Sequence, residues 1–523
     1  MLESYKMSSA DALKASVPAV AVGATGLVTF GTLTATMMQA LDTTIANVAL
    51  PHMQGSLSAS QEQVAWVLTS YIVASAIATT PTGYLANRYG IKRVFLIAVA
   101  GFTLASMLCG VASSLTEIVF YRLLQGVFGA ALVPLSQTTL LDSYPPEKQG
   151  AAMAAWGVGV MIGPIIGPAL GGWLTEYYSW RWVFYINLPI GIATFFALKT
   201  ALPDSGPRRA EPMDFTGFLF LSVAIASLQL MLDRGQSLDW FQSTEILIEC
   251  GLAIAALYLF ISHTITTDQP FISPKLFQDR NLLGGLILIA MLGIVLFSTF
   301  ALLPPFLQRL QGYPVVTAGL VMAPRGLGTM IAMQISGRIL HRVDARLPIL
   351  IGMVLLAYAL YWMSNFSADV GTREIVLSGM VQGLGLGFIF VPLSAVTFST
   401  LAPEYRGEGT SLYSLLRNVG SSVGIALAFA YQDYGTKMAH AVLAENITPF
   451  NPALIEYVNS SNGFNAASAL VGVESELQRQ SAVIGMLGDF HYMAIGVVCA
   501  IPLLLLLRPG KLGDDSSEIA VMD

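Results

Sequence analysis

The sequence predicts an all-α polytopic membrane protein, and three observations carry that prediction. Hydrophobic residues make up 54% of the 523 residues and charged residues only 11%, less than half of the roughly 25% that is usual in soluble domains. Windows such as 63–87 and 375–403 contain no Asp, Glu, Lys or Arg, and about 20 apolar residues are enough for a helix to cross a bilayer. The third observation is an internal repeat with the same orientation in both halves of the chain.

Fourteen transmembrane helices are expected from these windows. They lie near 22–50, 64–86, 93–112, 117–140, 150–174, 183–202, 215–232, 246–264, 282–304, 315–337, 347–365, 375–400, 411–432 and 490–507. An even number places both ends on one side of the membrane, and Lys and Arg favour the cytoplasmic side. With the amino terminus inside, cytoplasmic segments hold 17 of the 26 basic residues and external segments hold six. We therefore predict that both termini are cytoplasmic.

The repeat divides the chain into two six-helix bundles. Four segments recur in the same order at an offset of roughly 255 residues, and such a parallel repeat is typical of transporters whose halves rock about a central site. The matched segments are Gly83–Arg88 with Gly337–Arg342, Gln125-Gly126 with Gln382-Gly383, Val133–Ser136 with Val391–Ser394, and Pro146–Gly150 with Pro403–Gly407. Eight helices rather than six separate the copies, so two are inserted in a 6+2+6 arrangement.

This arrangement predicts five parts of the chain. They are a cytoplasmic segment 1–21, an amino-terminal bundle 22–202, two inserted helices with their loops in 203–281, a carboxy-terminal bundle 282–507, and a cytoplasmic tail 508–523. The carboxy-terminal bundle contains an external polar segment, 433–489, that is much longer than most connections. Two interpretations of it stay open: a solvated loop with a little helix of its own, or a docking surface for another protein.

Composition excludes several classes of function. The net charge of −6 and the absence of a basic tract give no footprint for nucleic acid. Cys109, Cys250 and Cys499 lie in apolar stretches, so neither a disulfide framework nor a CxxC site is expected. The five His are scattered, which leaves little material for a metal site or an enzyme centre. We expect no metal and no cofactor.

Asp42 and Arg122 are the charges that point to chemistry. A carboxylate within a membrane span is costly and is a functional candidate, and burial disfavours its charged form, so Asp42 is predicted to load and release protons. Arg122 stays protonated and shares a helix face with Gln125; it is predicted to tune a nearby carboxylate or to bind an anionic group. The alternatives are an Asp42 that reaches interfacial water and an Arg122 that extends to the external interface.

Helix 150–174 carries a stripe of glycines at every fourth position, with Pro164 and Pro168 interleaved. Such a stripe lets another helix approach closely, and the prolines favour a bend. This pattern predicts a close-packed, kinked interface that could serve as a hinge between the halves. Its glycines are Gly159, Gly163, Gly167 and Gly171.

A tight turn between the second and third helices is predicted to form part of a cytoplasmic gate. Its members are Gly83, Arg88, Gly90, Lys92 and Arg93, with Asp142 as the opposing carboxylate. Topology alone would also place basic residues there, but the recurrence of the turn in the second half favours gating. A greasy, adaptable substrate cavity is also expected, with Gln39, Trp66, Tyr71, Gln125 and Trp156 as its candidates.

These segments resemble the fourteen-helix drug:proton antiporters of the major facilitator superfamily. Leu41–Pro51 is similar to that family's signature in the first helix, Gly83–Arg93 to its loop motif, Arg122–Gly126 to its fourth-helix motif, and Gly159–Gly172 to its antiporter motif. Trp180–Gly191 and Leu230–Phe241 extend the match, and the latter is similar to the EmrB type. One departure is Asn87, where the loop motif usually has Asp, which leaves Asp142 as the expected carboxylate partner.

The resemblance implies proton-driven export of hydrophobic or amphipathic small molecules across a bacterial inner membrane, with Asp42 as the proton-coupling carboxylate and Arg122 as its partner. It also implies a periplasmic adaptor protein and, through it, an outer-membrane channel. Two alternatives stay open: a proton-coupled importer with the same core, and a non-transporting sensor or assembly platform.

Overall fold

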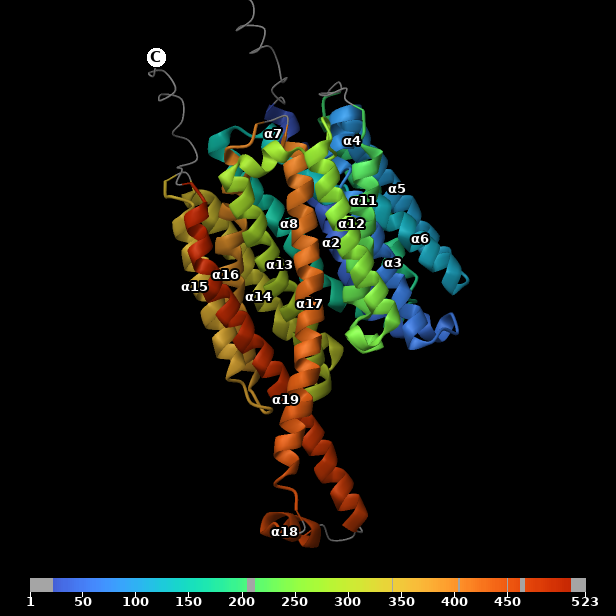
Figure 1. Cartoon of the computed structure of the whole chain (residues 1–523), viewed down its shortest axis with the longest axis vertical. Helices are drawn as coiled ribbons and strands as arrows, with labels where there is room; N and C mark the ends of the chain where they lie inside the picture. The colour runs from blue at the N-terminus through green and yellow to red at the C-terminus, as the bar shows by residue number, and fades with distance from the viewer. Residues whose placement is uncertain are drawn as a thin grey trace, which may run out of the picture.

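The computed structural model describes residues 22–204, 212–340, 342–402, 405–448, 450–460 and 466–508. Within these ranges the chain is helical throughout, with no strand (Figure 1). The predicted terminal segments lie outside the described residues, apart from Arg508. Helices occur at all fourteen predicted positions, so the expectation of an all-helical membrane fold is confirmed.

The amino-terminal half contains six spans, three of which are interrupted. Helices α3 and α4 form one bent pair, with an angle of 51° at the interruption between them. Pro81 lies at this interruption and directly precedes α4. A capping box stabilises the start of α3. The Ser60 hydroxyl accepts from the backbone N–H of Gln63, and the Gln63 side chain accepts from the Ser60 N–H. The helices are α2 (Val22–Ser56), α3 (Gln61–Thr79), α4 (Thr82–Tyr89), α5 (Ile91–Val111), α6 (Leu115–Gly129), α7 (Leu132–Ser143), α8 (Pro146–Tyr177), α9 (Trp182–Tyr185) and α10 (Asn187–Ala201).

The carboxy-terminal half packs around one large apolar core. Its first helix is capped by Asp279, whose carboxylate accepts from the N–H groups of Asn281 and Leu282 at 2.8 and 3.0 Å. Its helices are α13 (Arg280–Pro305), continued by a π turn (Phe306–Leu310), α14 (Val315–Ile339), α15 (Arg346–Ser364), α16 (Thr372–Ser399), α17 (Arg406–Ala444), α18 (Pro452–Ser460) and α19 (Ala466–Ala500), followed by a 3-10 turn (Ile501–Leu506). Short 3-10 turns also occur at Gln236–Leu238, Trp240–Gln242 and Pro274–Gln278.

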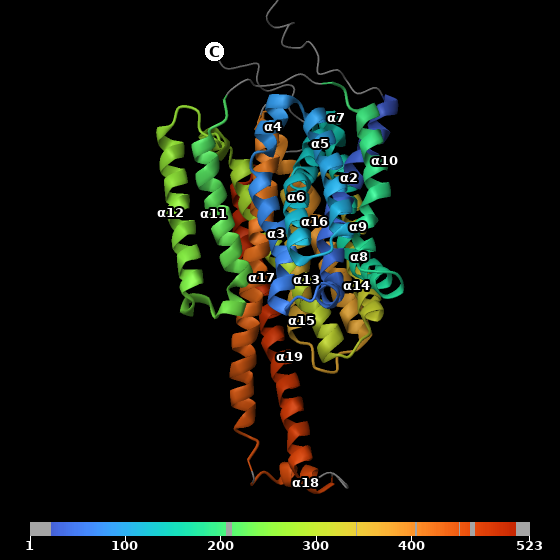
Figure 2. The same cartoon turned by 90° about the vertical axis from the view of Figure 1, so that its right-hand side faces the viewer.

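The two inserted helices, α11 (Phe215–Arg234) and α12 (Thr244–Thr266), lie at the outer edge of the bundle (Figure 2). Helix α11 contacts both halves, through α3 and α17. The Thr69 hydroxyl on α3 donates to the Asp233 carboxylate, and Gln229 Nε2 donates to the Ser422 hydroxyl on α17 at 2.7 Å. The insertion therefore joins the two halves along one side of the molecule.

Eleven helical segments in the described ranges are long and apolar enough to cross a membrane, and twelve if the bent α3–α4 pair forms one span. The other two predicted spans correspond to α2 and α14, which are 35 and 25 residues long. Both pack centrally, α2 against α8 and α14 against α8 and α16. They bury polar side chains, among them Asp42 in α2 and Arg325 in α14.

The predicted external loop 433–489 requires a correction. Helix α17 continues to Ala444 and α19 begins at Ala466, so most of this segment is helical. The two helices extend beyond the bundle as a hairpin with α18 at its tip (Figures 1 and 2). They approach closely, since a Cβ atom at Gly485 would lie 2.7 Å from the Gln432 carbonyl oxygen. We call this end of the molecule the hairpin face, and the opposite end, where α2 begins and the turn after α19 ends, the terminal face.

Candidate functional site

A buried ion pair lies inside the amino-terminal half. Arg122 on α6 donates through Nη1 to Asp42 Oδ2 on α2 at 2.7 Å. Both side chains have essentially no solvent exposure. The interpretations in which Asp42 reaches water or Arg122 extends to the interface therefore do not describe this structure. Two opposite charges at this distance compensate each other inside the bundle.

Neighbouring side chains complete the coordination of both charges. The second carboxylate oxygen, Asp42 Oδ1, accepts from Gln125 Nε2 at 2.8 Å and from Asn187 Nδ2 at 3.3 Å. Arg122 also donates through Nε to the Val67 carbonyl at 3.0 Å and through Nη1 to Gln125 Oε1 at 2.9 Å. Its guanidinium lies 4.2 Å from the centre of the Tyr71 ring. The carboxylate is thus held by three donors.

Asn187 is the member of this network that sequence reasoning missed. It begins α10, directly after the break at Ile186, and it also donates to the Ser106 hydroxyl at 3.0 Å. A polar amide inside the apolar stretch Trp182–Ala201 was the available signal. The network therefore joins α2, α3, α5, α6 and α10, so a change at Asp42 reaches most helices of this half.

The glycine stripe of α8 packs on α2, within the same half. A Cβ atom at Gly163 would lie 2.4 Å from the Ala40 carbonyl carbon, and one at Gly167 would lie 2.2 Å from the Thr44 hydroxyl oxygen. Gly159 and Gly171 likewise face Leu33 and Ile45 of α2. The prediction of a close approach agrees with this geometry, whereas the predicted hinge between halves requires correction: the stripe fixes α2 beside Asp42, and a different face of α8 contacts α14.

Two glycine pairs join the halves at the terminal face. A Cβ atom at Gly83 would lie 2.5 Å from the Gly407 carbonyl oxygen, and one at Gly337 would lie 3.0 Å from the Gly150 carbonyl oxygen. These are the same positions of the repeat, paired in both directions. The terminal face is therefore closed by two symmetry-related crossings, α4 with α17 and α14 with α8.

Of the predicted gate charges, Asp142 forms an ion pair across the two halves, whereas Lys92 does not. Asp142, at the end of α7, pairs with Arg406 at the start of α17 at 3.2 Å and so bridges the halves. Lys92 pairs instead with Asp204, in the segment directly after the amino-terminal bundle, at 3.2 Å, and Arg93 is exposed. Gly90 turns the chain from α4 into α5 with a φ of +88°, a conformation that favours glycine. Among these groups, Arg406 was absent from the sequence prediction.

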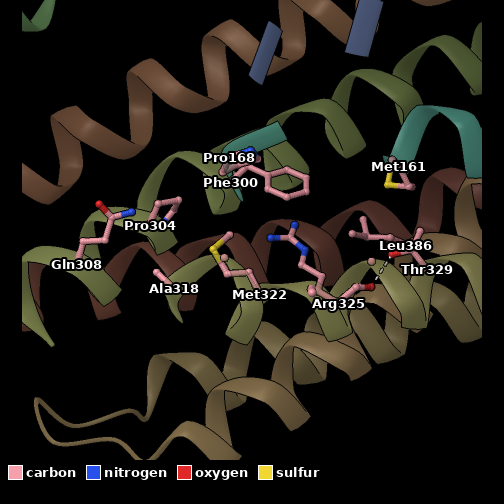
Figure 3. Close-up of a pocket in the computed structure, with 13 residues that line it drawn as sticks. Met161, Pro168, Phe300, Pro304, Gln308, Ala318, Met322, Arg325, Thr329 and Leu386 are labelled. Atoms are coloured by element: carbon pink, nitrogen blue, oxygen red, sulfur yellow. Dashed lines mark hydrogen bonds between the residues drawn. The ribbon is translucent and has the colours of Figure 1, made fainter. Parts of the chain in front are cut away.

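A narrow cavity lies between the halves (Figure 3). Its walls come from α8, which contributes Met161 and Pro168, and from the carboxy-terminal half. The latter contributes, among others, Phe300, Met322, Arg325 and Leu386. The cavity offers about 40 Å³ to water-sized molecules, which is room for a few waters.

None of the five predicted cavity residues lines this cavity of the described structure. Tyr71 and Gln125 belong to the Asp42 network, and Gln39 is half-buried on α2. Trp156 is buried between the halves, stacked on Phe390 with ring centres 5.6 Å apart. Trp66 is 38% exposed and lies beside Arg234. Of the aromatic candidates, only Trp156 lies on a helix that lines the cavity, α8, whereas Trp66 and Tyr71 lie on α3.

Comparison with known proteins identifies the family. A model of the Major Facilitator Superfamily matches residues 32–425. The chain is 38% identical over 467 residues to the Multidrug export protein EmrB of Escherichia coli K12, covering 88% of this chain and 91% of that protein. It is 35% identical over 478 residues to the Fatty acid resistance protein FarB of Neisseria gonorrhoeae, covering 91% and 94%.

Solved structures agree with this fold. The human organic anion transporter MFSD10 superposes with a TM-score of 0.58 at 12% identity, covering 92% of this chain and 98% of that one. A bacterial homologue of the lysosomal transporter Spinster, in an inward-facing conformation, gives 0.53 at 17% identity, covering 94% and 97%. The chain belongs to the Major Facilitator Superfamily and is a membrane transporter rather than an enzyme.

Proposed function

We propose that this protein exports hydrophobic or amphipathic small molecules in exchange for protons, by alternating access across a bacterial inner membrane. The observation that carries the proposal is the buried Asp42–Arg122 ion pair. A titratable carboxylate in a membrane span is a candidate for proton transfer. The names of the relatives, multidrug export and fatty acid resistance proteins, favour export and leave the substrate range broad.

The ion pair supplies a physical reason for coupling. When Asp42 takes up a proton, Arg122 loses its counter-charge while still buried, and breaking such a pair costs about 3–5 kcal/mol. A bias of this size shifts a two-state equilibrium by a factor of roughly a hundred or more. Protonation therefore favours a conformation in which the network hydrates or rearranges, and proton loading becomes linked to the movement of the halves.

The closed terminal face supports one direction of access. With both termini cytoplasmic, as the basic residues predict, this face is the cytoplasmic gate, built from Gly83, Gly407, Gly337 and Gly150. Asp42 would then receive its proton from the periplasmic side in this state, after substrate has left. Opening of the gate would return the proton to the cytoplasm and admit the next substrate.

Respiring inverted vesicles test the proposal. Ethidium added outside should collapse the pH gradient in vesicles carrying the native protein, because each ethidium that enters releases protons. In Asp42→Asn vesicles the collapse should fall to less than about a tenth, since the amide cannot carry a proton. Asp369→Asn, at a carboxylate with 89% side-chain exposure, is the control and should behave as the native protein.

The same vesicles separate the alternatives. An importer would show no collapse with external ethidium, but substrate loaded inside would leave together with protons. A sensor or assembly platform would move neither. Full activity of Asp42→Asn, at matched expression, would remove the carboxylate from the coupling role.

We further propose that the hairpin of α17 and α19 binds a periplasmic adaptor protein. It extends beyond the bundle (Figure 2) and exposes large apolar side chains although water surrounds it on this topology. Its two helices contact each other, for example through His440 and Glu474 at 3.1 Å. Its exposed apolar residues are Met438, Val442, Phe450, Ile455, Leu470 and Val471.

Charged substitutions on the hairpin provide the test. Val442→Glu and Val471→Glu should abolish co-purification of the cognate adaptor and lower drug resistance of cells by about tenfold or more, because a buried charge at an interface is strongly unfavourable. Ethidium–proton exchange in vesicles should persist. Phe241→Glu, at an exposed apolar side chain of the turn Trp240–Gln242 outside the hairpin, is the matched control and should bind the adaptor normally. Normal adaptor binding by both hairpin variants would contradict the proposal.

A further inference from the structure

Arg325 on α14 is a buried cation without a carboxylate partner in the described structure. It is 3% exposed. Nη2 makes one long contact of 3.5 Å to the Leu296 carbonyl oxygen, and the guanidinium lies 4.1 Å from the centre of the Phe300 ring. Among the described residues, Nε and Nη1 have no hydrogen-bond acceptor. A buried guanidinium in this state lacks compensation for its lost hydration.

The second half does not repeat the Asp42–Arg122 pair, because at the same offset its sequence has Thr299 and Gly379. Gln125 donates to the Asp42 carboxylate at 2.8 Å, and its repeat counterpart Gln382 donates through Nε2 to the Thr299 hydroxyl at 3.2 Å. A hydroxyl thus occupies, in the second half, the place that a carboxylate occupies in the first. The first half balances its cation internally, whereas the second half leaves Arg325 unbalanced.

The surroundings of Arg325 indicate what could balance it. The guanidinium points into the cavity between the halves, among Phe300, Met322 and Leu386 (Figure 3). Met161 and Pro168 of α8 close the opposite wall. Flexible Met side chains adapt to varied apolar shapes, and a guanidinium pairs well with carboxylates. One cation in an apolar cavity matches a molecule with one anionic group and an apolar body.

We propose that Arg325 binds the anionic group of an amphipathic substrate, whose apolar part lies against Met161, Met322 and Phe300. This inference rests on the proposed export function and assigns a substrate class to its central cavity. In this structure, with the terminal face closed, the cavity of about 40 Å³ is too small for such a molecule. Since its walls come from both halves, it widens when the halves separate during the transport cycle.

Binding of tritiated decanoate to the protein in lipid nanodiscs tests the proposal, with empty nanodiscs subtracted. Native protein should bind decanoate at least about tenfold more tightly than the neutral decanamide, as expected for hydrogen bonds to a charged group. Arg325→Met should lose that preference, and Arg325→Lys should retain part of it. The matched control is Arg417→Met, which removes a buried cation of α17 that does not line the cavity and should keep the preference.

Thermal stability separates a binding role from a structural one. Arg325→Met should melt no lower than the native protein, because it removes an unpaired buried charge, and decanoate should raise the melting temperature of the native protein alone. Equal native binding of decanoate and decanamide, or an unchanged preference in Arg325→Met, would overturn the proposal. So would an equal loss in Arg417→Met.

The vesicle assay keeps this inference apart from the proposed function. Ethidium–proton exchange by the native protein tests export, and the effect of Arg325→Met on decanoate binding tests the anion site. If decanoate binding depends on Arg325 but native vesicles exchange nothing, proton-driven export fails while the anion site stands. If exchange is normal and decanoate binding ignores Arg325, only the anion site fails.

Discussion

Breaking the Asp42–Arg122 pair from either side is expected to lower the free energy of unfolding by about 3–5 kcal/mol, because each single change strands a buried charge. Arg122→Met leaves the carboxylate with only the amide donors of Gln125 and Asn187. Asp42→Asn replaces a carboxylate that accepts from three donors with an amide that has one acceptor oxygen. The double variant should recover a large part of the loss, since no unpaired charge remains.

A double-mutant cycle measures this coupling. Melting temperatures of native protein, Asp42→Asn, Arg122→Met and the double variant would be compared in one detergent, with denaturant titration where unfolding is reversible. We expect a coupling free energy above about 1 kcal/mol. Losses that simply add would show that the two side chains stabilise the fold independently. The exposed pair Lys437–Asp433, at 2.7 Å, is the control and should show a coupling below about 1 kcal/mol.

Much of this fold could be predicted because the membrane penalises charge so strongly. Long charge-free windows have few alternatives to a spanning helix, and the repeat fixed their grouping into halves. Asp42 and Arg122 were conspicuous for the same reason, because a charge inside a membrane span carries a large free-energy cost. When two opposite charges lie in apolar helices of one bundle, pairing with each other lowers that cost most. The pairing follows from energetics, although its contacts with Gln125 and Asn187 depend on how α6 and α10 are rotated.

Other features depend on tertiary contacts that local sequence does not encode. The polar segments 433–444 and 466–489 resemble a loop in composition, yet they are helical because α17 and α19 support each other through a close approach at Gly435 and Gly485. The cavity residues were missed because Met and aromatic side chains occur on every face of these helices. Arg325 was visible in the sequence, but only the fold reveals that its Nε and Nη1 have no acceptor among the described residues.

A bulky side chain at Gly83 is expected to open the terminal face. A Cβ atom there would lie 2.5 Å from the Gly407 carbonyl oxygen and 2.6 Å from the Glu408 nitrogen, both backbone atoms that cannot rotate away. Gly83→Val therefore forces α4 and α17 apart, and overpacking of this kind costs about 1–3 kcal/mol. If the cost falls only on the closed state, the equilibrium shifts toward the open state by roughly 5- to 150-fold.

Cysteine labelling reports that shift. Thr138 is buried at this face, with its hydroxyl 2.8 Å from that of Thr410 across the two halves. In a protein whose Cys109, Cys250 and Cys499 are replaced by Ser, Thr138→Cys should therefore react slowly with a maleimide. Adding Gly83→Val should raise the labelling rate by at least about fivefold, and Gly337→Val should do the same from the other half, because its Cβ atom would lie 3.0 Å from the Gly150 carbonyl oxygen. Gly251→Val, on α12 where nothing lies within 4 Å of an added Cβ, should leave the rate unchanged.

The two possible outcomes have different meanings. Slow labelling in both gate variants, with transport intact, would mean that the helices can separate at the two glycine crossings while other contacts hold the face closed. Fast labelling in both would instead establish that the halves close through a pair of crossings related by the repeat. Each half would then contribute to the same gate one glycine of α4 or α14 and one glycine at the start of α8 or α17.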